Sequence, residues 1–295
     1  MNEAPCTYSV MMRQIKEYKS SRCLTVSTLG RSLVGRSIPL IRLGNGERSV
    51  LYVGTHHGME WLTTMVLLKY VSEVISSYEK RGAILGCDTE ELLKRRTVYI
   101  VPMLNPDGVE LQINGCDPMN PLFDRLHKMS GGSYEKWQAN GRGVDLNHNY
   151  NAGFNEYKRL EGELGITAGA TKFSGAHPES EPETSCLCSF IRTVEPSMLI
   201  ALHTQGSEIY YDYNGTCPGG SLSIAKRMER LSGYTVSRPD GTACYGGLKD
   251  WFISEFDRPA FTIECGKGEN PLPISDLNAV YSVTRGILHL GPTFV

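Results

Sequence analysis

Long apolar runs are missing from this sequence of 295 residues, and so is an excess of charge of either sign. No segment approaches the roughly 18–20 apolar residues that a membrane-spanning helix requires. The formal net charge is −2, and no run of Lys and Arg alternates with aromatic residues. The sequence therefore predicts a protein that binds neither nucleic acid nor an acidic membrane surface.

A disulfide framework and a secretory signal are also missing. The nine cysteines are odd in number and lack framework spacing, and the one close pair, Cys186 and Cys188, is too tight for the C-x₂₋₄-C pairs of a structural zinc site. Residues 1–21 lack a basic segment followed by an apolar one, so we expect no signal peptide. These features favour reduced thiols in the cytoplasm. A chain from which a signal peptide or a wall-binding domain had been removed would look the same.

Helical and strand patterns alternate along most of the chain, without repeats or low-complexity linkers. At 40% hydrophobic and 21% charged residues, the composition supports a sizeable core, and we predict one domain over residues 1–295. Strands are predicted at residues 24–29, 38–43, 49–54, 97–103, 197–202, 209–213 and 259–263. Helices are predicted at residues 8–19, 61–78, 179–194, 220–232, 248–256 and 276–290.

This alternation predicts an α/β fold, in which a mixed, mostly parallel, twisted sheet carries helices on both faces. The region from Pro106 to Pro178 departs from the pattern, because it is rich in Gly, Asn and Pro and is predicted to form long loops. Long loops inside a compact domain suggest a functional surface.

Three predicted strands end in residues that can bind a metal or move a proton. His57 and Glu60 follow the strand at 49–54, His203 ends the strand at 197–202, and Glu264 ends the strand at 259–263. Ligands of α/β sheets gather at such strand ends, and catalytic zinc takes three protein ligands and keeps one open position. Each residue alone is weak evidence, because a lone strand-end His is more often structural and H-x-x-E arises by chance. The combination favours a metal site.

Four segments in the same order resemble the zinc carboxypeptidase family. They are His57–Trp61 (H-x-x-E-W), Pro102–Gly108 (P-x-x-N-P-D-G), Gly143–Asn147 (G-V-D-x-N) and Phe261–Glu264 (F-T-I-E). The resemblance spans nearly the whole chain and implies a carboxypeptidase-like fold and a metallopeptidase. It implies one Zn²⁺ per chain, held by His57, Glu60 and His203.

The same resemblance assigns catalytic roles. Glu264 is implied to be the general base that takes a proton from a zinc-activated water, where the alternative is an ordinary strand-end carboxylate. Arg142 is implied to stabilise the oxyanion of the tetrahedral intermediate, where the alternative is a structural loop arginine.

Two positions depart from the exopeptidases of the family. Those enzymes carry Asn-Arg after Gly-Val-Asp-x, and that arginine binds the free carboxylate of the substrate. Here the pair is Asn147-His148, and His is largely neutral at pH 7. Tyr245 lies about three residues from the position of the family's mobile substrate-binding tyrosine. Without the arginine, the strongest reason to expect carboxypeptidase specificity is absent.

Further segments resemble a bacterial branch, the γ-D-glutamyl–meso-diaminopimelate peptidases, which cut peptidoglycan stem peptides. The segments are Asp145–Tyr150, Tyr245–Trp251 and Gly268–Pro273. The implied substrate is a stem peptide, cut at the γ-D-glutamyl–meso-diaminopimelate bond. Lys249 resembles the position that selects the substrate side chain, and a cation there would favour the distal carboxylate of diaminopimelate. The alternative is a solvated helix lysine.

Other functions compete with this prediction. An ordinary metallocarboxypeptidase would use His148 or another basic residue to bind the terminal carboxylate. A related deacylase is disfavoured by the long 106–178 region. A catalytically inactive module that binds wall fragments is disfavoured because the three ligands and Glu264 are all present.

Overall fold

A mixed eight-stranded sheet forms the centre of the computed structural model, which describes residues 4–120 and 122–295. Its strands stand in the order β1-β2-β6-β3-β7-β10-β8-β9. Their bounds are β1 (Leu24–Arg31), β2 (Ser37–Leu43), β3 (Arg48–Gly54), β6 (Arg96–Val101), β7 (Met198–His203), β8 (Glu208–Tyr210), β9 (Thr235–Ser237) and β10 (Ala260–Glu264). A separate two-stranded sheet pairs β4 (Ala83–Ile84) with β5 (Cys87–Asp88).

The four central strands run parallel. β6 pairs with β3, β3 with β7, and β7 with β10, all in parallel, whereas β1, β2 and β8 join through antiparallel pairs. Every residue of β7 is buried, as is every residue of β3 after Arg48. Continuous buried runs are typical of parallel strands covered on both faces, and the predicted mixed, mostly parallel sheet is confirmed.

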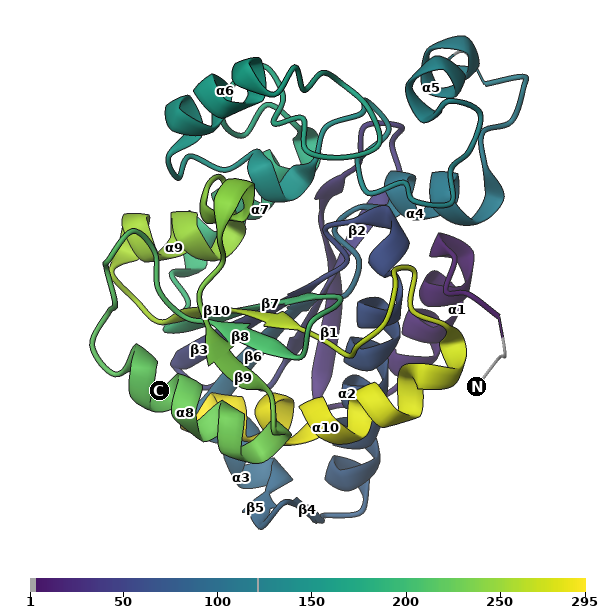
Figure 1. Cartoon of the computed structure of the whole chain (residues 1–295). Helices are drawn as coiled ribbons and strands as arrows, with labels where there is room; N and C mark the ends of the chain where they lie inside the picture. The colour runs from purple at the N-terminus through teal and green to yellow at the C-terminus, as the bar shows by residue number, and fades with distance from the viewer. Residues whose placement is uncertain (1–3, 121) are drawn as a thin grey trace.

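Helices cover both faces of this sheet (Figure 1). Val50 and Tyr52 of β3 belong to one core cluster, while Leu51 and Val53 belong to the other, because successive strand residues point to opposite faces. The first cluster includes residues of α1 (Tyr8–Tyr18), α2 (Leu62–Glu79), α8 (Ser221–Ser232) and α10 (Leu277–Leu290). The second includes residues of α7 (Pro182–Val194) and α9 (Leu248–Phe256).

The region predicted to be long loops is partly helical, so that prediction was wrong in part. It contains α4 (Pro106–Asn114), α5 (Phe123–Ser130) and α6 (Phe154–Glu163). Asn105-Pro106 starts a helix there: Pro106 occupies the first helical turn, and the side chain of Asn105 accepts a hydrogen bond from the Gly108 amide at 2.8 Å. The same residues form turns in other contexts, which explains the error.

Smaller elements were also missed, namely α3 (Thr89–Arg95), β9 and the β4–β5 pair. Each is short, and short elements carry little periodicity. No helix within the described ranges combines the length and the apolar character needed to cross a membrane. All nine cysteines lie within those ranges and all are free thiols.

Candidate metal centre

The sheet register brings the predicted metal ligands together. In the parallel pairs, Gly54 of β3 lies opposite Leu202 of β7, and Glu264 of β10 lies opposite His203 of β7. The carboxyl ends of three neighbouring strands therefore meet at one edge of the sheet. His57 and Glu60 follow β3 in a short 3₁₀ turn over Gly58–Glu60, which leads into α2.

Glycine is required at position 58 of this turn. A Cβ on Gly58 would lie 2.3 Å from the backbone oxygen of Gly108 and 2.9 Å from that of Trp137. The Gly58 amide donates to the carbonyl of Gln138 at 2.9 Å. The turn that carries His57 and Glu60 thus lies in direct backbone contact with α4 and with the segment 137–142.

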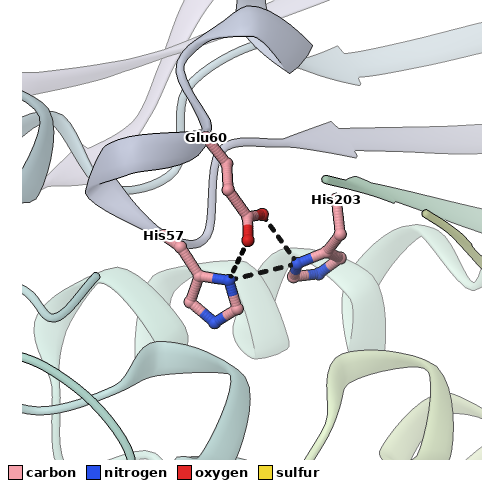
Figure 2. Close-up of side chains that lie close together, drawn as sticks. All are labelled: His57, Glu60 and His203. Atoms are coloured by element: carbon pink, nitrogen blue, oxygen red, sulfur yellow. Dashed lines mark hydrogen bonds and ion pairs between the residues drawn. The ribbon is translucent and has the colours of Figure 1, made fainter. Parts of the chain in front are cut away.

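Three side chains converge on one point (Figure 2). Nδ1 of His57 lies 2.8 Å from one carboxylate oxygen of Glu60, and Nδ1 of His203 lies 3.1 Å from the other. The two Nδ1 atoms are 3.3 Å apart. Zinc–nitrogen bonds of about 2.0–2.1 Å in a tetrahedral site hold two ligand nitrogens roughly 3.3–3.4 Å apart. Both the donor set and its spacing fit a zinc ion.

Asp145 supports the cluster from behind. His57 donates from Nε2 to Asp145 at 3.0 Å, and the carboxylate also accepts from the backbone amides of Lys172 and Asn147. This bond fixes the tautomer that leaves Nδ1 of His57 facing the cluster, as carboxylates behind metal-bound histidines do. The sequence motif contained Asp145, but its spacing alone gave no sign of this role.

Electrostatics at the centre favour added positive charge. Burial would raise the pKa of Glu60, but His57 and His203 outweigh it and lower that pKa to about 2. Burial would likewise raise the pKa of Asp145, but the charge of His57 and the hydrogen bonds from His57 and the Lys172 amide hold it far below its usual range. Burial would lower the pKa of His57, and the two carboxylates raise it well above its usual range. Two ionised carboxylates therefore draw a cation to the histidines.

Glu264 faces the same cavity, which has a volume of about 220 Å³. Burial, and then the charge of Glu60, raise the pKa of Glu264 well above its usual range. A carboxylate with a raised pKa beside a hydrolytic centre is suited to accept and return a proton near neutral pH.

The structure separates the remaining predicted site residues into two groups. Asn147, His148 and Lys249 line the cavity together with the metal cluster. Arg142 and Tyr245 do not belong to its lining. The Arg142 side chain is 43% exposed, and its Nε lies 3.6 Å from the buried carboxylate of Glu181. Tyr245 lines a neighbouring cavity of about 280 Å³.

Gln138 and Lys172 also line the cavity, and both side chains carry N–H groups that can donate to an oxyanion. Sequence reasoning missed both. Gln138 lies four residues before Arg142 and directly after Trp137, which is fully buried. An expected burial of Trp137 was the signal that could have pointed to Gln138 as a site residue. Lys172 belongs to none of the sequence motifs described above.

His148 is engaged in packing. Its ring stacks on Tyr157 with centroids 4.1 Å apart, and its Nδ1 lies 2.9 Å from the carbonyl of Tyr245. Burial lowers the pKa of His148 despite the nearby Asp145. A neutral, stacked imidazole cannot replace the guanidinium that binds a terminal carboxylate. Asn147 accepts a hydrogen bond from the Leu248 amide at 3.1 Å, which links the cavity to the start of α9.

Comparison with known proteins agrees with this centre. The family model described as zinc carboxypeptidase matches residues 8–285. The chain belongs to the zinc carboxypeptidase family. It is therefore a zinc metallopeptidase, a hydrolase whose substrates are peptides, and the predicted family membership and enzyme class are confirmed.

Two relatives and one solved structure show how far this family likeness extends. The chain is 32% identical over 287 residues to γ-D-glutamyl-L-diamino acid endopeptidase 1 of Lysinibacillus sphaericus, which covers 96% of this chain and 71% of the relative. It is 36% identical over 266 residues to an uncharacterized protein of Bacillus subtilis (strain 168), covering 88% of this chain and 69% of the relative. The fold matches the crystal structure of a carboxypeptidase A from Helicoverpa armigera, with a TM-score of 0.73, 20% identity, and coverage of 99% of this chain and 74% of that one.

Proposed function

We propose that this family member hydrolyses the γ-D-glutamyl–meso-diaminopimelate bond of peptidoglycan stem peptides, with one zinc ion held by His57, Glu60 and His203. The observation that carries the proposal is the convergence of these three donors beside Glu264 in one cavity. The bond is suggested by the relative named as a γ-D-glutamyl-L-diamino acid endopeptidase.

The side chains divide the chemistry among them. Zinc at this centre would polarise the scissile carbonyl and make water more acidic. Glu264 takes a proton from the attacking water and passes it to the departing amine, for which its raised pKa is suited. Asp145 keeps the His57 ring in its coordinating orientation through the 3.0 Å bond.

The oxyanion requires hydrogen-bond donors beyond the metal. We assign this role to the amide of Gln138 and the ammonium of Lys172, because both line the cavity. Arg142, which the family resemblance implied, is engaged by Glu181 outside that lining. Separate Gln138→Ala and Arg142→Ala variants test the assignment. The first is expected to lower kcat by on the order of tenfold or more, and the second to leave it within a factor of a few.

An internal bond is favoured over a C-terminal one. A carboxypeptidase must bind the terminal carboxylate, and His148, one candidate for that role, is stacked on Tyr157 with its pKa lowered. We therefore expect the enzyme to remain active on a stem peptide in which the α-carboxylate of diaminopimelate, the residue that follows the scissile bond, is amidated. If amidation removes most of the activity, the enzyme is a carboxypeptidase.

Mass spectrometry of defined muropeptides is the decisive experiment. Stem tripeptides and tetrapeptides are incubated with the zinc-loaded enzyme and, as the matched control, with the Glu264→Gln variant. Fragments split between D-glutamate and diaminopimelate, formed by the wild type and not by the variant, are expected. Release of only the terminal D-Ala from the tetrapeptide would contradict the proposal. Metal analysis of the same sample, with about one zinc per chain expected, separates an active peptidase from an inactive wall-fragment-binding module.

A further inference from the structure

A buried ion pair lines the catalytic cavity away from the metal ligands. Lys249 and Asp250 are neighbours in the first turn of α9, and each residue is only 3% exposed. The Lys249 ammonium forms an ion pair with the Asp250 carboxylate and also donates to the backbone carbonyl of Asp212. Both Lys249 and Asp250 belong to the cavity lining. The helix thus presents a cation and an anion side by side to whatever enters.

The charges around this pair sum to zero. The carboxylate of Asp212 is matched by Arg238, whose Nε lies 2.6 Å away, and Lys249 is matched by Asp250. His148, which also faces the cavity, has a lowered pKa. A ligand with a single charge would leave this buried group of charges unbalanced, and an unbalanced buried charge is strongly destabilising. A ligand that carries both charges would not.

Lys249 and Asp250 retain unused hydrogen-bond positions for such a ligand. A lysine ammonium has three N–H donors, and Asp250 and Asp212 engage two of them. A carboxylate offers about four acceptor positions on two oxygens, and Lys249 and the Gly247 amide occupy two of them on Asp250. One donor of Lys249 and further acceptor positions of Asp250 are therefore left for groups in the cavity.

We propose that Lys249 and Asp250 together form a receptor for a zwitterion, that is, for one carbon bearing both a free ammonium and a free carboxylate. This inference rests on the proposed function, in which the distal centre of diaminopimelate is such a carbon. Lys249 binds its carboxylate and Asp250 binds its ammonium. The proposal alters the sequence-based hypothesis, in which Lys249 alone favours any distal carboxylate.

Three substrates that differ only in the distal group test the receptor. They are γ-D-glutamyl-meso-diaminopimelate (both charges), the L-lysine analogue (ammonium only) and the L-2-aminopimelate analogue (carboxylate only). We expect kcat/KM to fall by on the order of 10- to 100-fold for each single-charge analogue, because each leaves one buried partner unpaired. Equal turnover of the aminopimelate analogue and the diaminopimelate substrate would overturn the role of Asp250. Equal turnover of all three would overturn the receptor.

A double variant shows whether the pair causes this selectivity. Lys249→Met/Asp250→Asn removes both charges together, which leaves no uncompensated buried charge and spares the fold. We expect it to bring the three kcat/KM values to within a factor of a few of one another. The matched control is Lys226→Met/Glu229→Gln, which removes an exposed ion pair on α8 and is expected to keep the wild-type ratios. Circular dichroism melts check that both variants fold.

Binding to the metal-free chain separates failure of the receptor from failure of the proposed function. Without metal the three compounds are not cleaved, and isothermal titration calorimetry measures their affinities directly. Tighter binding of the zwitterionic compound by the wild type, lost in the double variant, supports the receptor even if the zinc-loaded enzyme cuts none of them. Cleavage by the loaded enzyme combined with equal affinities would support the peptidase and overturn the receptor.

Discussion

The two ends of the cavity hold buried charge in opposite ways. At the metal end, formed by His57, Glu60, His203 and Glu264, carboxylates gather around imidazoles and no Lys or Arg is paired with them among the residues that the structure describes. At the far end, formed by Lys249 and Asp250, each charge has its partner in the chain. The first end therefore requires a cation to be complete, whereas the second requires none. This difference assigns the chemical reaction to the first end and the selection of the substrate to the second.

Removal of the metal should affect only the first end, and it has the largest expected effect. Chelation should lower peptidase activity below detection, and added Zn²⁺ should restore it, because the ligands leave a position for the reacting groups. His203→Ala should abolish both zinc binding and activity. The Lys249→Met/Asp250→Asn variant should retain about one zinc per chain. Zinc content and activity measured on the same samples check this, and an active His203→Ala protein with bound zinc would contradict it.

Substitution of the proposed base comes next. Glu264→Gln should lower kcat by about 10²–10⁴-fold, because the amide cannot accept a proton, while KM and zinc content change little. The matched control is Glu208→Gln: Glu208 faces Glu264 in the β8–β10 register but is hydrogen-bonded to Tyr210 and does not line the cavity. Its kcat should stay within a factor of a few. Similar losses in both variants would show that Glu264 acts through general charge rather than as the base.

A smaller effect, on zinc affinity, is expected from substitution of Asp145, which lies behind the metal ligands. Asp145→Asn weakens the bond that orients His57 and should reduce zinc affinity by about 10–100-fold. A competition titration against a zinc chelator measures this. The Lys249→Met/Asp250→Asn variant is the comparison at the far end, since it also neutralises a buried aspartate in the cavity lining and leaves no buried lysine unpaired, and it should leave zinc affinity unchanged. If both variants lose zinc equally, the two ends are not independent.

The pH profile gives the smallest and most graded effect. Burial and the charge of Glu60 raise the pKa of Glu264, and only the ionised form accepts a proton. Activity should therefore fall as the pH drops through this pKa, by at most about tenfold per unit, with a midpoint above the ordinary value of 4.5. A bound cation moves the midpoint down toward that value. The profile of kcat/KM checks this, and the limb should be missing from the residual activity of Glu264→Gln.

Much of the fold and the metal cluster could be predicted from the sequence, because the signals are local. Buried apolar runs marked the parallel strands and showed metal-binding residue types at their ends, and the family resemblance implied that His57, Glu60 and His203 are the ligands. The error over residues 106–178 arose where local signals are ambiguous: Asn105-Pro106 serves both turns and helix starts, and only packing decides between them.

The other features of the site depend on contacts between distant segments. Arg142 is engaged by Glu181, which lies on a different segment, and no local pattern foretells that contact. Asp250 follows Lys249 in the sequence, but a role for the pair can be inferred only from the burial of both residues in the cavity lining. Gln138 enters the cavity because Trp137 is buried beside it.

The side-chain amide of Asn105 binds the turn that carries His57 and Glu60 (the metal turn) to the segment 137–142. Besides capping α4, Asn105 donates from its side chain to the carbonyls of His56, Gln138 and Ala139 at 2.9–3.2 Å, and Gly58 leaves no room between these parts. The metal turn and the segment 137–142 therefore behave as one rigid body, and the cavity cannot widen there without displacing His57. Replacement of a side chain at the start of α9, by contrast, alters the cavity lining and leaves this rigid body in place.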